Sequence, residues 1–289
     1  MKIDNIAFLI PIHPPYYHYI YNLINKCRNN DIEVDIFLVF SNTSDYDNFN
    51  MKNDINPIIC DTSITYPVIV TFKKFFALKQ FINSKYDYII CCDAEIDILC
   101  HNFTNENINN KIQNIFNNKK IYAGDTSKNE MEGEVTCNII QMTGEQCEIA
   151  CNITQISANL FPDKDEFLKN VTKNFTLYFW WSDLPVYRRT DIPQFLNMIN
   201  YDNIVFYHFD YIIYQYYLIL CHGFEIINTT PITKLNWSLE FLHRVNDIDI
   251  LNKLIDIGYG FSWNTLKTYQ QHENVIELQK GFMLYHLDR

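Results

Sequence analysis

The first half of the chain alternates continuous apolar segments with segments of helical periodicity. Apolar runs at residues 5–12, 34–40 and 56–60 predict buried strands, and a fourth begins within "YDYIICC" at Tyr86. Helices are predicted at residues 16–29 and 68–83, the second carrying Phe and Leu at helical spacing. Strands that are apolar throughout and alternate with helices predict an α/β fold, with a mostly parallel central sheet flanked by helices on both faces.

Polar residues follow three of these predicted strands at their carboxyl ends. The segments are Pro11-Ile12-His13, Phe40-Ser41-Asn42 and Asp93-Ala94-Glu95. Parallel strands end at the same edge of a sheet, and ligands of α/β proteins bind at that edge. We therefore expect the three segments to converge on one rim.

After Asn118 the alternation of strands and helices is less regular. A strand is predicted at residues 120–125, a strand running into a loop at 175–189, an apolar helix at 209–223 ended by Gly223, and a strand in "FEIIN". No repeat and no linker rich in Gly, Pro or Ser interrupts the chain. We predict a single domain over residues 1–289, with a first half at 1–125 and a second half at 126–289.

Composition narrows the class of protein. The chain has 289 residues, of which 48% are hydrophobic, and its formal net charge is −11, so a nucleic-acid partner is not expected. The N-terminal apolar run is too short for a signal peptide, and the apolar run at 211–221 is about half of the ~20 residues that span a bilayer. Nine cysteines without a C-x-x-C pair favour reduced thiols over disulfides or zinc. We expect a soluble, cytoplasmic protein with no transmembrane segment.

The distribution of glycine excludes two common kinds of nucleotide site. The chain has seven glycines, and the first is Gly124. A dinucleotide-binding Rossmann turn and a P-loop both need glycines so that the backbone can approach phosphate groups. Phosphates bound at this rim would have to be neutralised by a metal ion or by placed lysines.

The segment "YDYIICCDAEIDI" delivers two carboxylates, Asp93 and Glu95, to the tip of a buried strand. With 34 acidic residues, about four such triplets are expected by chance, so the placement matters more than the motif. If the strand continued, alternation would point both side chains to the same side. Carboxylate oxygens suit Mg²⁺ or Mn²⁺. The alternative is that both are solvated turn residues.

These features resemble one enzyme family. The glycine-poor α/β half, the acidic D-x-D-like triplet after a strand, the lysine-bearing helix "FKKFFALKQF" directly before it and the aromatic second half look like GT-A fold nucleotide-sugar glycosyltransferases, in particular the small capsule- and virus-type enzymes. The resemblance is best over the first ~100 residues. Glu95 stands where the commonest motif has Asp, which keeps the charge and lengthens the side chain.

The resemblance implies transfer of a sugar from a nucleotide diphosphate donor, most simply a UDP-sugar, to a hydroxyl of a glycan or glycoprotein acceptor. It makes residues 1–125 the donor-binding half and 126–289 the acceptor half. Asp93 would contact the ribose or a Mn²⁺ or Mg²⁺ ion, and Glu95 would be the closer metal ligand. The remaining donor-binding candidates are Ala94, the nucleoside-pocket residues Pro11, Ile12 and His13, and Lys73 or Lys74 near the base or diphosphate. For the lysines the alternative is a solvated helix face, and for His13 it is a rim histidine without a ligand.

Two candidates come from later segments. "FWWSDLPVY" resembles the place where such enzymes put sugar-stacking aromatics beside an acid: Trp180 and Trp181 would point to opposite sides, with Trp181 the donor-cleft candidate, and Asp183 is the candidate that acts on the acceptor hydroxyl. A turn or N-cap role before Pro185 fits Asp183 equally well.

The C-terminal "GFMLYHLDR" has an apolar run that must be buried, so the tail is expected to return to the body of the protein. His286 is the candidate third metal ligand, as the resemblance implies. The alternative is that it only caps a docked tail.

A different functional class also fits these features. A carbohydrate-binding or interaction protein without catalytic activity would keep the fold and the aromatic residues, and would not bind a donor through a metal.

Overall fold

A computed structural model describes residues 2–61, 69–98, 100, 103–125, 177–178, 185–199, 204, 210–233, 248–256, 263–265 and 284–286. The aromatic and acidic candidates of the "FWWSDLPVY" segment lie outside the described residues, namely Trp180, Trp181 and Asp183. So do all residues between 126 and 176.

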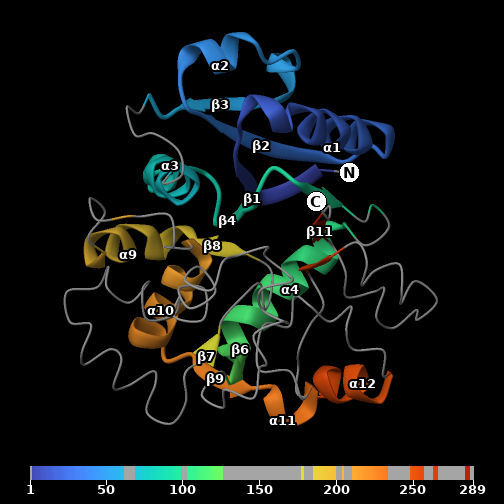
Figure 1. Ribbon diagram of the computed structural model, residues 1–289, viewed down its shortest axis with the longest axis vertical. Coiled ribbons are helices and arrows are strands. Elements are labelled where there is room, and N and C mark those ends of the chain that lie inside the picture. The colour runs from blue at the N-terminus through green and yellow to red at the C-terminus, as the bar shows by residue number, and fades with distance from the viewer. Residues whose placement is uncertain are drawn as a thin grey trace, which may run out of the picture.

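The core of the molecule is a five-stranded, mostly parallel sheet (Figure 1). Its order is β3-β2-β1-β4-β8, with bounds Lys2–Pro11 for β1, Glu33–Phe40 for β2, Asn56–Ile59 for β3, Tyr88–Cys91 for β4 and Val186–Arg188 for β8. β1 to β4 pair in parallel, and β8 runs antiparallel to β4. The α/β fold class predicted from the apolar runs is therefore confirmed.

The central position of β1 explains its composition. It pairs with β2 on one side and β4 on the other, and residues Ile6 to Ile10 are at most 2% exposed. A strand covered on both faces carries apolar residues in succession instead of alternating with polar ones. The edge strand β3 contains Pro57, which has no N–H to offer a further strand and so protects the free edge.

Helices cover both faces of this sheet (Figure 1). α1 (Tyr17–Asn29) and α2 (Thr43–Asp47) lie against β2, whereas α3 (Ile69–Leu78) and α4 (Asn105–Asn118) lie against β1. The strand order shows that the chain moves outward from β1 to β3 and then returns across the sheet to β4. The short 3₁₀ segments are Pro14–Tyr16, Lys52–Asp54, Lys79–Phe81 and Arg189–Asp191.

A second group of described elements, from β6 onward, lies below the five-stranded sheet (Figure 1). β6 (Lys120–Asp125) pairs in parallel with β9 (Glu225–Asn228) and antiparallel with β7 (Leu177–Tyr178). The helices are α9 (Ile192–Met198), α10 (Asp210–His222), α11 (Thr230–Thr233) and α12 (Ile248–Asp256). Gly223 ends α10 with φ +65°, the left-handed conformation that favours glycine, as the sequence predicted. Within the described part of the chain, no helix has the length and apolar character needed to cross a bilayer.

The end of the chain returns to the first half, as predicted. β11 (Leu284–His286) pairs in parallel with β10 (Trp263–Thr265) and antiparallel with β5 (Ile96–Ile98). In this register His286 lies opposite Ile96, the residue that follows Glu95.

Candidate functional site

The carboxyl ends of β1, β2 and β4 meet at one edge, as the sequence predicted. The ladder continues beyond β1 through the Ile12 amide, which donates to the Val39 carbonyl at 3.0 Å. It continues beyond β4 through the Cys92 amide, which donates to the Leu9 carbonyl at 3.0 Å. Along this edge Pro11 and Ile12 are buried, and His13 is exposed.

The acidic segment lies directly after β4. The strand ends at Cys91, and Asp93, Ala94 and Glu95 form a bend that leads into β5. The two carboxylates differ in environment, since the Asp93 side chain is 28% exposed and Glu95 is 4% exposed. Because the strand has already ended, pleat alternation does not set the direction of this pair. The condition for that alternation, a strand that continues through both acids, is not met. Glu95 is buried, so the reading of both acids as solvated turn residues is wrong.

A buried ammonium holds Asp93 in place. Lys74, on α3, is 1% exposed, and its Nζ lies 3.0 Å from Asp93 Oδ1 and 2.8 Å from Asp210 Oδ1. Asp210 is the first residue of α10, and its second oxygen accepts a hydrogen bond from the Tyr187 hydroxyl at 3.0 Å. One ammonium is thus shared by two carboxylates that come from different elements. We call Asp93, Lys74, Asp210 and Tyr187 the Lys74 cluster.

The electrostatics of the Lys74 cluster follow from its burial. Burial by itself would lower the pKa of Lys74, but Asp210 and Asp93 outweigh it, and the pKa is raised. Burial raises the pKa of Asp210, while the Lys74 ammonium lowers it. The position of Asp210 at the amino end of α10 also favours a carboxylate there. Counted as charged groups, two carboxylates and one ammonium leave the cluster with a net charge of −1.

Lys73 points to a different strand end. Its side chain is 1% exposed, and its Nζ donates to the Ile12 carbonyl at 2.7 Å. Within the described residues, that carbonyl is the one hydrogen-bond acceptor of this ammonium. Burial lowers the pKa of Lys73 to about 8, although Asp45 and Cys60 raise it. The solvated helix face considered for Lys73 and Lys74 is therefore wrong for both.

The acidic segment offers donors that suit a hard divalent cation. Asp93 and Glu95 supply carboxylate oxygens, which are the donors that Mg²⁺ and Mn²⁺ prefer. The Lys74 ammonium nearby lies between two carboxylates, Asp93 and Asp210, so it does not cancel the negative charge of this region. Among the side chains that the structure describes, no group of three or more His, Cys, Asp or Glu forms a metal-binding cluster. The backbone of His286 lies beside Ile96, and its side chain is outside the described part. Metal binding by Asp93, Glu95 and His286 stays a prediction.

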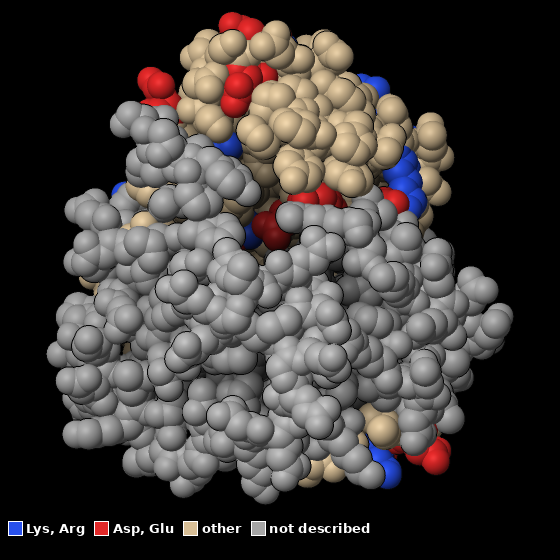
Figure 2. Space-filling view, in the orientation of Figure 1, with Lys and Arg blue, Asp and Glu red and all other residues tan. Residues whose placement is uncertain are grey.

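Figure 2 shows acidic side chains, with basic ones beside them, along the lower margin of the N-terminal part of the molecule. The segment that carries Trp181 and Asp183 is not described, but the residue that follows it is: the Pro185 carbonyl accepts a hydrogen bond from the Cys91 amide at 2.8 Å. β8 therefore begins beside the strand end that leads to Asp93.

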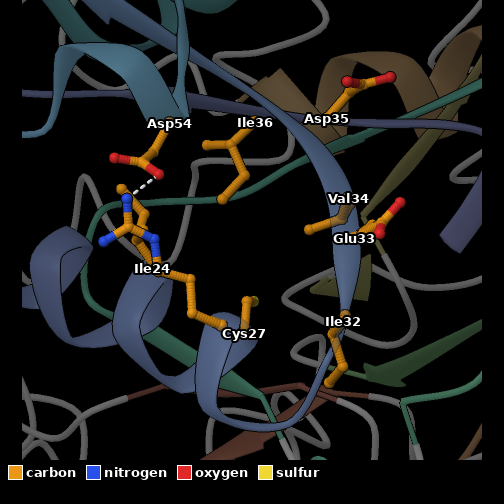
Figure 3. Close-up of a pocket in the computed structure, with 9 residues that line it drawn as sticks. Ile24, Cys27, Ile32, Glu33, Val34, Asp35, Ile36 and Asp54 are labelled. Atoms are coloured by element: carbon orange, nitrogen blue, oxygen red, sulfur yellow. Dashed lines mark hydrogen bonds and ion pairs between the residues drawn. The ribbon is translucent and has the colours of Figure 1, made fainter. Parts of the chain in front are cut away.

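A separate hollow lies at the opposite edge of the sheet (Figure 3). It has a volume of about 260 Å³ between the end of α1 and the beginning of β2, and an ion pair between Arg28 and Asp54 closes one side. Its lining includes Glu33 and Asp35, at the amino end of β2. Because ligands of parallel α/β sheets bind at carboxyl ends, we place the candidate site at the acidic segment and not in this hollow.

Two members of the Lys74 cluster were not found by sequence reasoning. Asp210 stands at the start of an apolar helix, where an acidic residue has an ordinary role at the helix end, and Tyr187 is one of 20 tyrosines. Asp210 lies 136 residues from Lys74 in sequence, so no local pattern links them. The available signal was the lysine itself, since a lysine on a buried helix needs a buried acid.

Comparisons with known proteins give little. No protein-family model and no curated protein sequence matches the chain. Among solved structures, the crystal structure of S. aureus TarS 1-349 matches with a TM-score of 0.34 and 13% identity, covering 96% of this chain and 80% of that one. At this score and identity, the likeness assigns neither a fold nor a function to the chain.

Proposed function

We propose that the protein is a metal-dependent glycosyltransferase, which moves a sugar from a nucleotide diphosphate sugar, most simply a UDP-sugar, to a hydroxyl of a glycan or protein acceptor. The observation that carries the proposal is the pairing of the buried Lys74 ammonium with Asp93, two residues before Glu95, at the carboxyl edge of a mostly parallel sheet. A buried ion pair adds little net stability, and at a ligand-binding edge its use is to hold one carboxylate in a fixed place.

The glycine-free first half supports the same conclusion. A donor diphosphate bound at this edge has no glycine-rich loop whose backbone could approach it. Its charge is then met by side chains or by a cation. In this proposal Asp93 and Glu95, with His286 as the third ligand, hold Mn²⁺ or Mg²⁺, which when bound stabilises charge on the leaving diphosphate.

The other residues have roles set by their place at the rim. Pro11, Ile12 and His13 lie at the end of β1 and line the nucleoside side of the donor, with Lys73 fixed on the Ile12 carbonyl. Trp181 stacks on a sugar ring, and Asp183 accepts the proton of the acceptor hydroxyl or orients that hydroxyl. The segment that carries Trp181 and Asp183 leads into Pro185, beside Cys91.

The proposal also places the protein in a reducing, cytoplasmic compartment. The cysteines that the structure describes are all free, namely Cys27, Cys60, Cys91, Cys92, Cys100 and Cys221. Burial raises the pKa of the Cys91 and Cys92 thiols, so both are held in the protonated form beside the acidic segment.

The test is a thermal-shift screen of UDP-, GDP- and CMP-linked compounds with and without Mn²⁺, followed by donor hydrolysis with the best ligand. A ligand that binds the native state raises the melting temperature as its concentration exceeds the Kd. We expect a shift that needs both Mn²⁺ and one nucleotide, and that is lost in Glu95→Gln, which removes a charge with little change of shape.

The matched control is Glu33→Gln, an exposed glutamate at the opposite edge of the sheet, which should keep the shift. If no nucleotide shifts the wild-type protein with metal, while simple glycans do, the protein is a carbohydrate-binding protein and the proposal is wrong. A Glu95→Gln variant that works at ordinary metal concentration overturns the assignment of the metal site.

A further inference from the structure

We propose that Asp210 is a positioning residue that sets the negative charge of the acidic segment, and so its affinity for a divalent cation. The inference rests on the proposed function, because it concerns the cation site at Asp93 and Glu95. Asp210 itself acts through Lys74.

The geometry makes Asp210 a competitor for the ammonium of Lys74. Lys74 Nζ lies 2.8 Å from Asp210 and 3.0 Å from Asp93, so both carboxylates share its charge. Asp210 is 3% exposed and is fixed by the Tyr187 hydroxyl at 3.0 Å and by the beginning of α10. Asp93 is the more exposed partner, at 28% of its side chain.

This arrangement decides how much charge is left on the exposed side. With Asp210 present, the buried Asp210 carboxylate offsets most of the positive charge of Lys74. The negative charge of Asp93 then stays largely uncompensated at the rim. Without Asp210, Lys74 would form an exclusive pair with Asp93, and the net charge of the cluster would rise from −1 to 0. A divalent cation is sensitive to such a change, because it interacts with a nearby unit charge twice as strongly as a monovalent cation does. Inside a protein this interaction falls off only slowly with distance.

Two features indicate that Asp210 does more than stabilise the fold. A buried ion pair gives little net stability, and a single carboxylate would already satisfy the charge of Lys74. The second carboxylate adds a buried negative charge whose pKa burial raises. Its distinct effect is to leave Asp93 with charge that a cation can use.

The test measures Mn²⁺ binding directly, without donor and without turnover. Free Mn²⁺ is followed by electron paramagnetic resonance during titration of wild type, Asp210→Asn and Tyr187→Phe. We expect Asp210→Asn to raise the half-saturating Mn²⁺ concentration on the order of tenfold. Tyr187→Phe removes a hydrogen bond but no charge, and it should shift this concentration much less.

The matched control is Asp191→Asn. Asp191 is also 3% exposed and accepts hydrogen bonds from the Arg188 side chain, which lies opposite Tyr88 at the amino end of β4. It is therefore a buried, paired carboxylate just after β8, on the side of the sheet where β4 begins and not where β4 ends in the acidic segment. It should lower stability without moving the Mn²⁺ titration.

A double variant, Lys74→Met with Asp210→Asn, keeps the inference testable if Asp210→Asn does not fold. It removes one positive and one negative charge and leaves no unpaired buried ion, so it should fold, and the net charge of the cluster stays −1. It should bind Mn²⁺ with only the smaller loss that follows from a less firmly held Asp93. Binding tenfold weaker than wild type in the double variant would overturn the inference, as would an unchanged titration in a folded Asp210→Asn. If the wild-type protein binds no Mn²⁺, alone or with UDP, the proposed function fails first, and the inference falls with it.

Discussion

Lys73 gives the sharpest test of the energetics of this rim. Its ammonium is buried beneath the end of β1 and has the Ile12 carbonyl as its hydrogen-bond acceptor within the described residues. Replacing it with methionine keeps the length and flexibility of the side chain and removes the charge. We expect Lys73→Met to stabilise the fold near pH 7.

The magnitude follows from the pKa of the lysine. Burial lowers that pKa to about 8, from 10.5 in an unfolded chain. At about 1.4 kcal/mol for each pKa unit, the charged form is disfavoured in the folded protein by about 3 kcal/mol. The lost hydrogen bond to Ile12 offsets about 1 kcal/mol of this. Lys73→Met should therefore raise the free energy of unfolding by about 2 kcal/mol at pH 7.

The sign of the pH dependence is fixed by the direction of the pKa change. Between pH 8 and pH 10.5 the unfolded chain keeps the proton on Lys73 while the folded protein releases it. The unfolded state then binds more protons, so the stability contributed by this group rises with pH through that window. Below pH 8 the penalty is present in full. The advantage of Lys73→Met should shrink steadily as pH rises from 8 to 10.5.

The measurement is urea unfolding of wild type and Lys73→Met at pH 7 and pH 10, which cancels other groups that titrate in both proteins. Lys79→Met, at an exposed lysine six residues later, is the control and should have little effect at either pH. A variant that is less stable than wild type at pH 7, or whose difference does not change with pH, would refute the reasoning. A gain in stability together with loss of the nucleotide-induced shift would show that the lysine is kept for binding.

Two further predictions concern residues whose side chains lie outside the described part of the chain. Asp183→Asn should lower turnover at least tenfold while the nucleotide affinity stays within twofold, because the residue acts on the acceptor side; steady-state kinetics beside UDP titration will separate the two, and a parallel loss of UDP affinity would contradict the assignment. His286→Ala should raise the Mn²⁺ concentration needed for activity with little loss of stability in the metal-free protein, whereas a histidine that only caps the tail would change stability and leave the metal dependence in place.

The central sheet could be predicted because its signal is local. β1, β2 and β4 are apolar without interruption, and burial on both faces is what such strands require. α4 was missed for a local reason as well. Its sequence "NENINNKIQNIFNN" is dominated by asparagine, a poor helix former, and only Ile108, Ile112 and Phe116, spaced four residues apart, mark its buried face.

The candidate site could be predicted only in part. The acidic segment was located because it follows a buried strand, and the edge on which it lies is a consequence of parallel pairing. The burial of Lys73 and Lys74 could have been read from α3, whose other residues are all apolar except Thr71. The partner of Lys74 could not, because Asp210 reaches it through tertiary packing of α10 against α3.

The burial of both lysines bears on what this edge is for. Each ammonium must be desolvated when the chain folds, and replacing buried ions with apolar groups of similar size is often neutral or stabilising. A helix that served only to pack against β1 would be more stable with leucine or methionine at these positions. Lys73 is fixed on the carbonyl of Ile12, the first residue after β1, and Lys74 on the first acid after β4. The two charges are thus directed at the two strand ends that a ligand at this edge would contact. That placement is expected of a binding site that trades stability for fixed charges, and packing alone gives no reason for it.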